Sequence, residues 1–303
     1  MRDLVRAPAA AGLGGGRLVL FGGGLILGAL LFWSTAQPLL AAAALLLAGV
    51  SYALLLITTH DAVHGTLLGR PRLEFALACL ISWPMAWPFA TYASLHRLHH
   101  RWNGRDRRDP ERVEPLGSEC RRAGALRRWH QCHPFWGRVL LLGGLGLIAD
   151  TAHKGWQLRH SDGWLPARLL LDGVGVLAVH AAMLTLALAA GVVGRYLLFW
   201  LVLERTIGAI VQTRGLIEHH GLWRTGPSGL LTQLYASATV TAPGWLNIAL
   251  GGLPHHAAHH AFPSIPFQRL PLATERISEV LASHQQPPLP RLAGYRAAVR
   301  ELL

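Results

Sequence analysis

Charged side chains are scarce in this 303-residue chain: they make up 15% of it, against 51% hydrophobic residues. An ordinary soluble domain has roughly a quarter of its residues charged, so the composition excludes a typical water-soluble surface. The high apolar content equally excludes a disordered chain. Acidic residues are outnumbered, which gives a formal net charge of +12, and Lys154 is the only lysine. A basic excess on so apolar a chain points to a membrane.

Recognisable redox and nucleotide motifs are also missing. The three cysteines, Cys79, Cys120 and Cys132, have no metal-ligand spacing, and their odd number argues against a disulfide framework, so we expect reduced thiols. There is no His-Pro-Gly-Gly haem signature and no paired CxxC, and the glycine run 12–16 does not follow a strand. No nucleic-acid-binding motif accompanies the arginines, which excludes a nucleic-acid partner.

Long apolar runs are present in four places, each close to the roughly 20 residues that a membrane helix needs. Short turns at 35–38 and 191–195 join them in pairs, so we predict an all-α integral membrane fold with four transmembrane helices in two hairpins. We expect the first hairpin to be retained rather than cleaved as a signal, and one domain to span residues 1–303. The predicted spans are Leu18–Ser34, Leu39–Thr58, Leu169–Ala190 and Tyr196–Val211.

Two further apolar stretches are ambiguous. Leu73–Leu95 is long enough to span, but Pro84 and Pro88 break helical hydrogen bonding at its centre, and the adjacent tryptophans prefer the headgroup level. We interpret it as an interfacial or re-entrant segment. Trp136–Ile148 is too short to span comfortably and is expected to lie at the interface.

Arginine distribution predicts the orientation. Ten arginines lie between His96 and Arg128 against five acids, and the N-terminus is basic as well. The positive-inside rule therefore places both termini, the basic region 96–165 and the C-terminal region 212–303 on the cytoplasmic side, in a bacterial inner membrane.

Histidine is abundant instead, with 17 residues, and these are clustered. Residues three and four apart on a helix share a face, so each cluster can turn its imidazoles toward a metal ion. Eight or nine histidines exceed the needs of one ion, which favours two metals. The clusters lie at His60/His64, His96/His99/His100 and His255/His256/His259/His260, with a fourth group at Glu218-His219-His220. All clusters can lie on the same side of the membrane only if the segment Leu73–Leu95 returns to the side of the membrane from which it enters.

The order HxxxH, HxxHH and HxxHH on a four-helix membrane scaffold resembles the membrane fatty acid desaturase and hydroxylase superfamily. The stretch His256–Pro266, followed by Arg269-Leu270-Pro271, is especially similar to the third histidine box of that family. The resemblance implies a non-haem di-iron centre that uses O2 as co-substrate. It implies as ligands His60, His64, His96, His99, His100, His219, His256, His259 and His260.

The chain departs from the family pattern where the third box often reads Asn-Tyr-His, because it has Pro254-His255-His256 there. His255 either replaces a ligand or supports one, and His220 competes with His219. Asp61 and Glu218 are adjacent to ligands and either orient imidazole N–H groups or are ordinary helix-surface acids.

The resemblance implies an oxidoreductase acting on a lipid acyl chain, most simply a fatty acid desaturase. Hydroxylation, carotenoid ketolation or hydroxylation, and decarboxylation use the same boxes and stay open. Electrons must come from a separate donor of the ferredoxin, rubredoxin or cytochrome type, which the arginine-rich loop could attract. Trp83, Trp87 and Tyr92 either line an acyl channel or anchor the interface.

Two rivals belong to other classes. A divalent-metal transporter would hold its ligands near the membrane midplane, whereas these histidines lie at helix ends. A membrane b-type cytochrome would hold its haem ligands within the spans, where only His180 lies.

Overall fold

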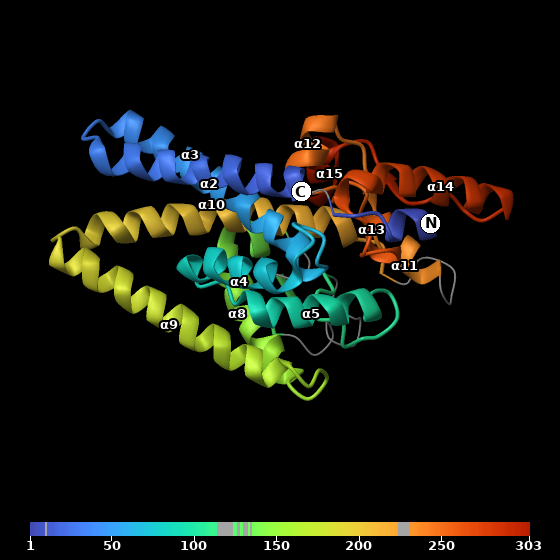
Figure 1. The fold of residues 1–303 in the computed structure, drawn as a ribbon, viewed down its shortest axis with the longest axis horizontal. Coiled ribbons are helices and arrows are strands. Elements are labelled where there is room, and N and C mark those ends of the chain that lie inside the picture. The colour runs from blue at the N-terminus through green and yellow to red at the C-terminus, as the bar shows by residue number, and fades with distance from the viewer. Residues whose placement is uncertain (10, 114–123, 126–127, 130–132, 134, 224–230) are drawn as a thin grey trace.

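A computed structural model describes residues 1–9, 11–113, 124–125, 128–129, 133, 135–223 and 231–303. Helices dominate it, and five are long and apolar enough to cross a membrane (Figure 1). Four of these contain the predicted spans, which confirms an all-α membrane fold. They are α2 (Ala11–Ser34), α3 (Pro38–Val63), α9 (Leu165–Ala189) and α10 (Val193–His219). The helix α2 starts earlier than expected because the glycine run 12–16 is helical.

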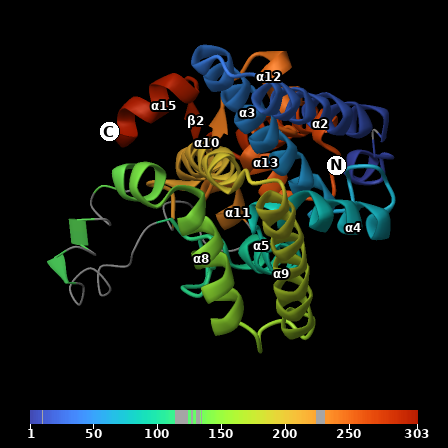
Figure 2. The same cartoon turned by 90° about the vertical axis from the view of Figure 1, so that its left-hand side faces the viewer.

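The four helices form the two expected hairpins, α2 with α3 and α9 with α10 (Figure 1). The turns of both hairpins lie at one end of the molecule, and the N-terminus lies with the C-terminal helices at the other. In the end-on view, α10 lies at the centre, with α3 on one side and α8 on another (Figure 2). Only 6% of the apolar window of α9 is buried. Its exposed leucines therefore suit contact with lipid.

The fifth long helix corrects the sequence analysis. Trp136–Ile148 is not a short separate segment: η2 (Phe135–Leu142), a π-helix, continues into α8 (Gly143–Gln157), and together they are long enough to span. Asp150 and Lys154 ended the apolar run in the sequence, but they pair one turn apart at 2.6 Å within the helix. An i,i+4 ion pair supports a helix rather than ending it.

The junction between η2 and α8 lies against α10. Glu204 accepts a hydrogen bond from the Leu145 amide at 2.5 Å, and Arg205 donates to the Leu142 carbonyl at 2.7 Å. These two side chains satisfy backbone groups that the break in the helix frees. A Cβ on Gly208 would lie 2.1 Å from the Gly144 nitrogen, so only glycine permits the two backbones to approach so closely.

The segment that contains Pro84 and Pro88 is broken, as predicted. It consists of α4 (Pro71–Ser82), the 3-10 turn η1 (Trp83–Met85) and α5 (Phe89–Trp102), with a bend of 113°. Asp172 of α9 accepts hydrogen bonds from the Ala90 and Thr91 amides, at 3.2 and 2.7 Å, and from the Trp83 indole at 2.9 Å. A carboxylate from another helix thus caps the start of α5.

The C-terminal part is built of short elements around a two-residue parallel ladder, β1 with β2, in which Thr239 pairs with Arg291. The β1 strand also joins the end of α10 to the third histidine box: Ala238 donates to the Glu218 carbonyl and Val240 to the Pro254 carbonyl, at 2.8 and 2.7 Å. The elements are α11 (Thr232–Tyr235), β1 (Thr239–Val240), α12 (Gly244–Ala249), α13 (His256–Ala261), η4 (Phe267–Arg269), α14 (Leu270–Ser283), β2 (Arg291–Leu292) and α15 (Tyr295–Leu302), while α1 (Arg2–Val5) packs against this part from the N-terminus.

Candidate metal centre

The nine predicted ligand histidines meet in one buried region at the ends of four helices. The last turn of α3 carries the first box, α5 the second and α13 the third, and α10 ends on His219. On α5 and α13 the 3.6-residue period turns the histidines of each box toward the same region. The sequence analysis also expected these histidines at helix ends.

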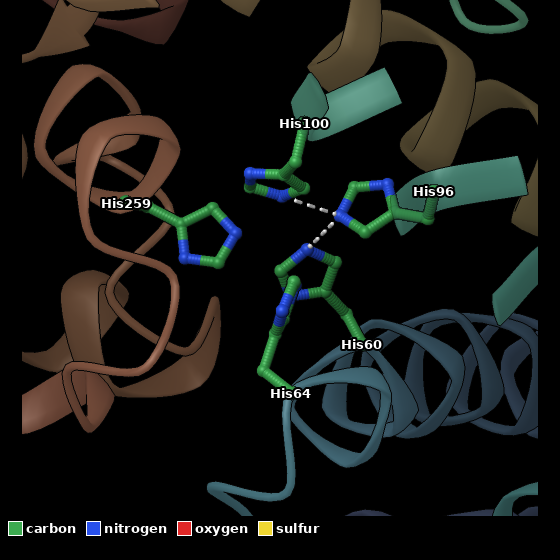
Figure 3. A group of neighbouring side chains, drawn as sticks. All are labelled: His60, His64, His96, His100 and His259. Carbon is green, nitrogen blue, oxygen red and sulfur yellow. Dashed lines mark hydrogen bonds between the residues drawn. The ribbon is translucent and has the colours of Figure 1, made fainter. Parts of the chain in front are cut away.

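One group holds five histidines from three helices (Figure 3). Their rings point toward a common centre from opposite sides. The Nε2 atom of His96 lies 2.9 Å from Nε2 of His60 and 3.0 Å from Nε2 of His100. One ring nitrogen from each member lies within 4.8 Å of the others, which is close enough to hold an ion. The members are His60, His64, His96, His100 and His259.

A second group lies directly beside the first. His99, His219 and His260 bring ring nitrogens within 4.8 Å of one another. His256 adjoins them, with its Nε2 atom 2.9 Å from that of His219 and 3.2 Å from that of His260. With His256 beside the second group, the nine histidines form two adjacent sets of five and four.

Hydrogen bonds on the far side of three rings favour the tautomer in which the inward nitrogen carries no proton. The Nδ1 atoms of His96, His99 and His219 face Glu111 at 2.7 Å, Asp109 at 2.7 Å and the Ala236 carbonyl at 3.1 Å. When Nδ1 donates in this way, the neutral ring keeps a lone pair on Nε2, and each of these Nε2 atoms points into a group.

The donor chemistry fits metal binding in two other respects. Within the part of the chain that the structure describes, the Nε2 atoms of His64, His99 and His259 are buried without a hydrogen-bond partner, a costly state that a bound ion would relieve. Burial lowers the pKa of His256, His259 and His260 well below its ordinary value. Their rings are therefore neutral at neutral pH, as ligation requires.

Asp109 and Glu111 were missed by the sequence analysis. Both follow the second box closely, in the stretch Arg107–Arg112, where the surrounding arginines made the loop look like a solvated charge run. The available signal was their spacing: two acids flanking Pro110 within eleven residues of His100 can fold back onto the box.

The four other residues that the sequence analysis singled out fall into two sets. Asp61 lies beside the first group, with Oδ1 3.6 Å from His60 Nδ1, and Glu218 beside the second, with Oε2 3.4 Å from His256 Nε2. His255 instead turns its Nδ1 atom toward the Thr274 hydroxyl at 2.9 Å, and His220 is exposed. Within the described residues neither histidine belongs to a metal-binding group.

A cavity of about 160 Å³ opens from the histidines into the space between α3, α5, α8 and α10. Its walls include His60 and His96 of the first group and His219 and His256 of the second. Trp87 and Tyr92 line it, in agreement with one of the two predicted roles, whereas the Trp83 indole is turned to Asp172. Its apolar lining comes from Leu56, Ile57, Met85, Leu147, Ile148, Ile207 and Val211.

A sequence comparison with curated proteins gives no match. The sequence model of the family described as "Fatty acid desaturase" matches residues 36–290, which cover all three histidine boxes. With the helical membrane fold and the converging histidines, this match shows that the chain belongs to the fatty acid desaturase family of membrane oxidoreductases.

Proposed function

We propose that the protein is an O2-dependent di-iron desaturase that introduces a double bond into a lipid acyl chain. The observation that carries the proposal is that nine histidines, seven of them buried and His64 and His100 half-buried, form two adjacent groups that both line one largely apolar cavity. The ligands proposed are those nine histidines, with five around one ion and four around the other. When bound, the two iron ions supply the activation of dioxygen that cleavage of an unactivated C–H bond requires.

The chain's own residues bind the substrate and exclude water. The apolar walls from α3, α8 and α10 suit a methylene chain, and Trp87 and Tyr92 line the same space, with the Tyr92 ring centre 5.2 Å from that of His96. Holding a methylene beside the ligands, away from water, is the protein's main contribution to such a reaction. Asp109 and Glu111 keep the His99 and His96 rings oriented.

The electron donor proposed is a separate ferredoxin, rubredoxin or cytochrome. Exposed arginines follow the second box at 101, 105, 107 and 108, and an acidic donor would be attracted to them. The same basic surface supports a cytoplasmic orientation of both termini and the boxes in a bacterial inner membrane.

The test is to purify the protein, measure iron and zinc per chain, and compare host lipids with and without expression. The proposal expects two irons per chain and a new acyl double bond. A hydroxylated product would indicate hydroxylation instead of desaturation. A keto product would indicate ketolation, and a shortened hydrocarbon would indicate decarboxylation. Zinc alone, or unchanged lipids with increased metal uptake, would overturn it in favour of a metal transporter.

A further inference from the structure

Arg17 is a buried cation near the start of α2, with only 3% of its side chain exposed. It lies outside residues 36–290, which the family match covers. In the sequence it is one of several basic residues before an apolar run. Burying a guanidinium is costly unless charged or polar partners surround it, so its partners indicate what it does.

Those partners lie on three separate parts of the chain. Nη1 contacts Asp61 Oδ2 at 2.6 Å, and Nη2 donates to the Ala249 carbonyl at 3.4 Å. The guanidinium carbon lies 4.9 Å from the centre of the Phe267 ring, a cation–π distance. Arg17 thus connects α2 to the end of α3 and to α12 and η4, the elements before and after the third histidine box.

Asp61 links this contact to the histidines. Its second oxygen, Oδ1, lies 3.6 Å from Nδ1 of His60, and that nitrogen is buried with no hydrogen-bond partner among the residues that the structure describes. A shift of about half an ångström would bring the pair to hydrogen-bond length. Since Arg17 holds Oδ2, the carboxylate presents Oδ1 to the His60 ring.

The backbone before the third box is shaped around the same guanidinium. Gly251 has a φ of +63°, and a Cβ placed there would lie 2.7 Å from Arg17 Nη2. Both the left-handed conformation and the nearby guanidinium therefore require glycine.

We infer that Arg17 is a positioning residue: through Asp61 it orients the His60 ring for metal binding, and it fixes the loop that leads to the third box. This inference rests on the proposed function, because it assigns His60 to a metal ion. Partners that orient a ligating histidine typically contribute 10–100-fold to metal affinity.

The test compares Arg17→Gln, Arg17→Lys and Asp61→Asn with a matched control, Arg195→Gln. Arg195 also packs on a phenylalanine ring of α2, Phe32, and donates to the Thr35 carbonyl at 2.8 Å, but at the opposite end of that helix. Full-length proteins in detergent are stripped of metal and titrated with Co²⁺, and the affinity, the visible ligand-field spectrum and the thermal midpoint are recorded.

We expect Arg17→Gln and Asp61→Asn to bind Co²⁺ about 10–100-fold more weakly, with an altered spectrum. Arg17→Lys keeps the charge and should recover part of the affinity. The control should lower the thermal midpoint without moving the spectrum. If Arg17→Gln does not fold, the Co²⁺ affinity and the spectrum of Arg17→Lys and Asp61→Asn test the inference.

Unchanged affinity and spectrum in the folded Arg17 variants, beside a wild type that binds two Co²⁺ ions, would overturn this inference alone. A wild type that binds no Co²⁺ would overturn the proposed function and this inference with it.

Discussion

Each proposed ligand group is assembled from single imidazoles that approach from different helices. His99 belongs to the second group and His259 to the first. Both are buried, and among the described residues their Nε2 atoms have no hydrogen-bond partner. On the proposed ligation, removing either ring would leave one ion short of a ligand and open a small void in its place.

We predict that His99→Ala and His259→Ala each reduce iron to at most about one ion per chain and lower turnover by roughly 100-fold or more, beyond the loss expected for a supporting residue. Membrane insertion should be unchanged. His284→Ala, at an exposed position, is the control. Metal analysis and product formation check this, and an active His99→Ala protein would contradict the ligand assignment.

The carboxylates behind the rings give a second prediction. Asp109→Asn and Glu111→Gln remove the charge that accepts from His99 and His96, so metal affinity should fall about 10–100-fold while the fold is kept. Asp106→Asn, in the same loop but paired with exposed Arg108, should bind metal as the wild type does. Equal affinities in all three variants would show that these carboxylates do not tune the site.

At the scale of elements, buried acids hold apolar helices together. Asp172 caps α5, which carries the second box, from within α9. Glu74 does the same for the turn after the first box, accepting from the Leu68 and Arg70 amides at 2.8 Å. In each case a carboxylate in an apolar run satisfies the backbone beside a histidine box.

Asp172→Ala should therefore lower stability by about 1–3 kcal/mol, because it leaves buried amides unsatisfied, and should weaken metal binding through α5. Thr185→Ala, on the exposed face of the same helix, is the control. Thermal unfolding in detergent and a Co²⁺ titration measure the two effects. A stable variant with normal metal affinity would rule out this capping role.

The crossing of α8 and α10 yields another prediction. Gly208→Ala places a methyl group against the Gly144 backbone and should cost about 1–3 kcal/mol by overpacking. Gly194→Ala, also on α10 but with open space around its Cβ position, should change stability by less than about 1 kcal/mol. Comparing their thermal midpoints tests the packing directly, and equal midpoints would mean that the crossing relaxes easily.

Patterns formed by residues close in sequence predicted these elements well. They could not predict contacts between residues that are distant in sequence. Pro84 and Pro88 predicted the broken segment because proline disrupts hydrogen bonds of its own turn. The apolar stretch Trp136–Ile148 looked too short to span because the helix continues past it through Asp150 and Lys154, which form an ion pair one turn apart. The box spacings predicted that eight of these histidines converge and the family resemblance added His219, whereas Arg17 could not be associated with Asp61 across 44 positions without the folded chain.

Over the whole molecule, exposed basic side chains and exposed apolar side chains lie in different regions of the surface. The exposed leucines lie on the long helices, and exposed arginines follow the second box. A donor protein approaching the histidines from outside the membrane would therefore meet a basic surface.

We predict that turnover with an acidic ferredoxin weakens as salt rises from about 0.01 to about 0.3 M, where the Debye length falls from about 30 Å to below 10 Å. Arg101→Glu and Arg107→Glu should reproduce that loss at low salt by raising KM for the donor. Arg296→Glu, exposed on α15, should not. Salt-insensitive turnover would argue against docking on this surface.

The two ligand groups share their helices. On α5, His99 belongs to one group and His100 to the other, and on α13 the neighbours His259 and His260 divide in the same way. An ion that orders both helices also orders three of the ligands proposed for its neighbour, so less conformational entropy is lost when the second ion binds. Loading should therefore be cooperative, and protein carrying a single ion should be rare at every stage of a metal titration.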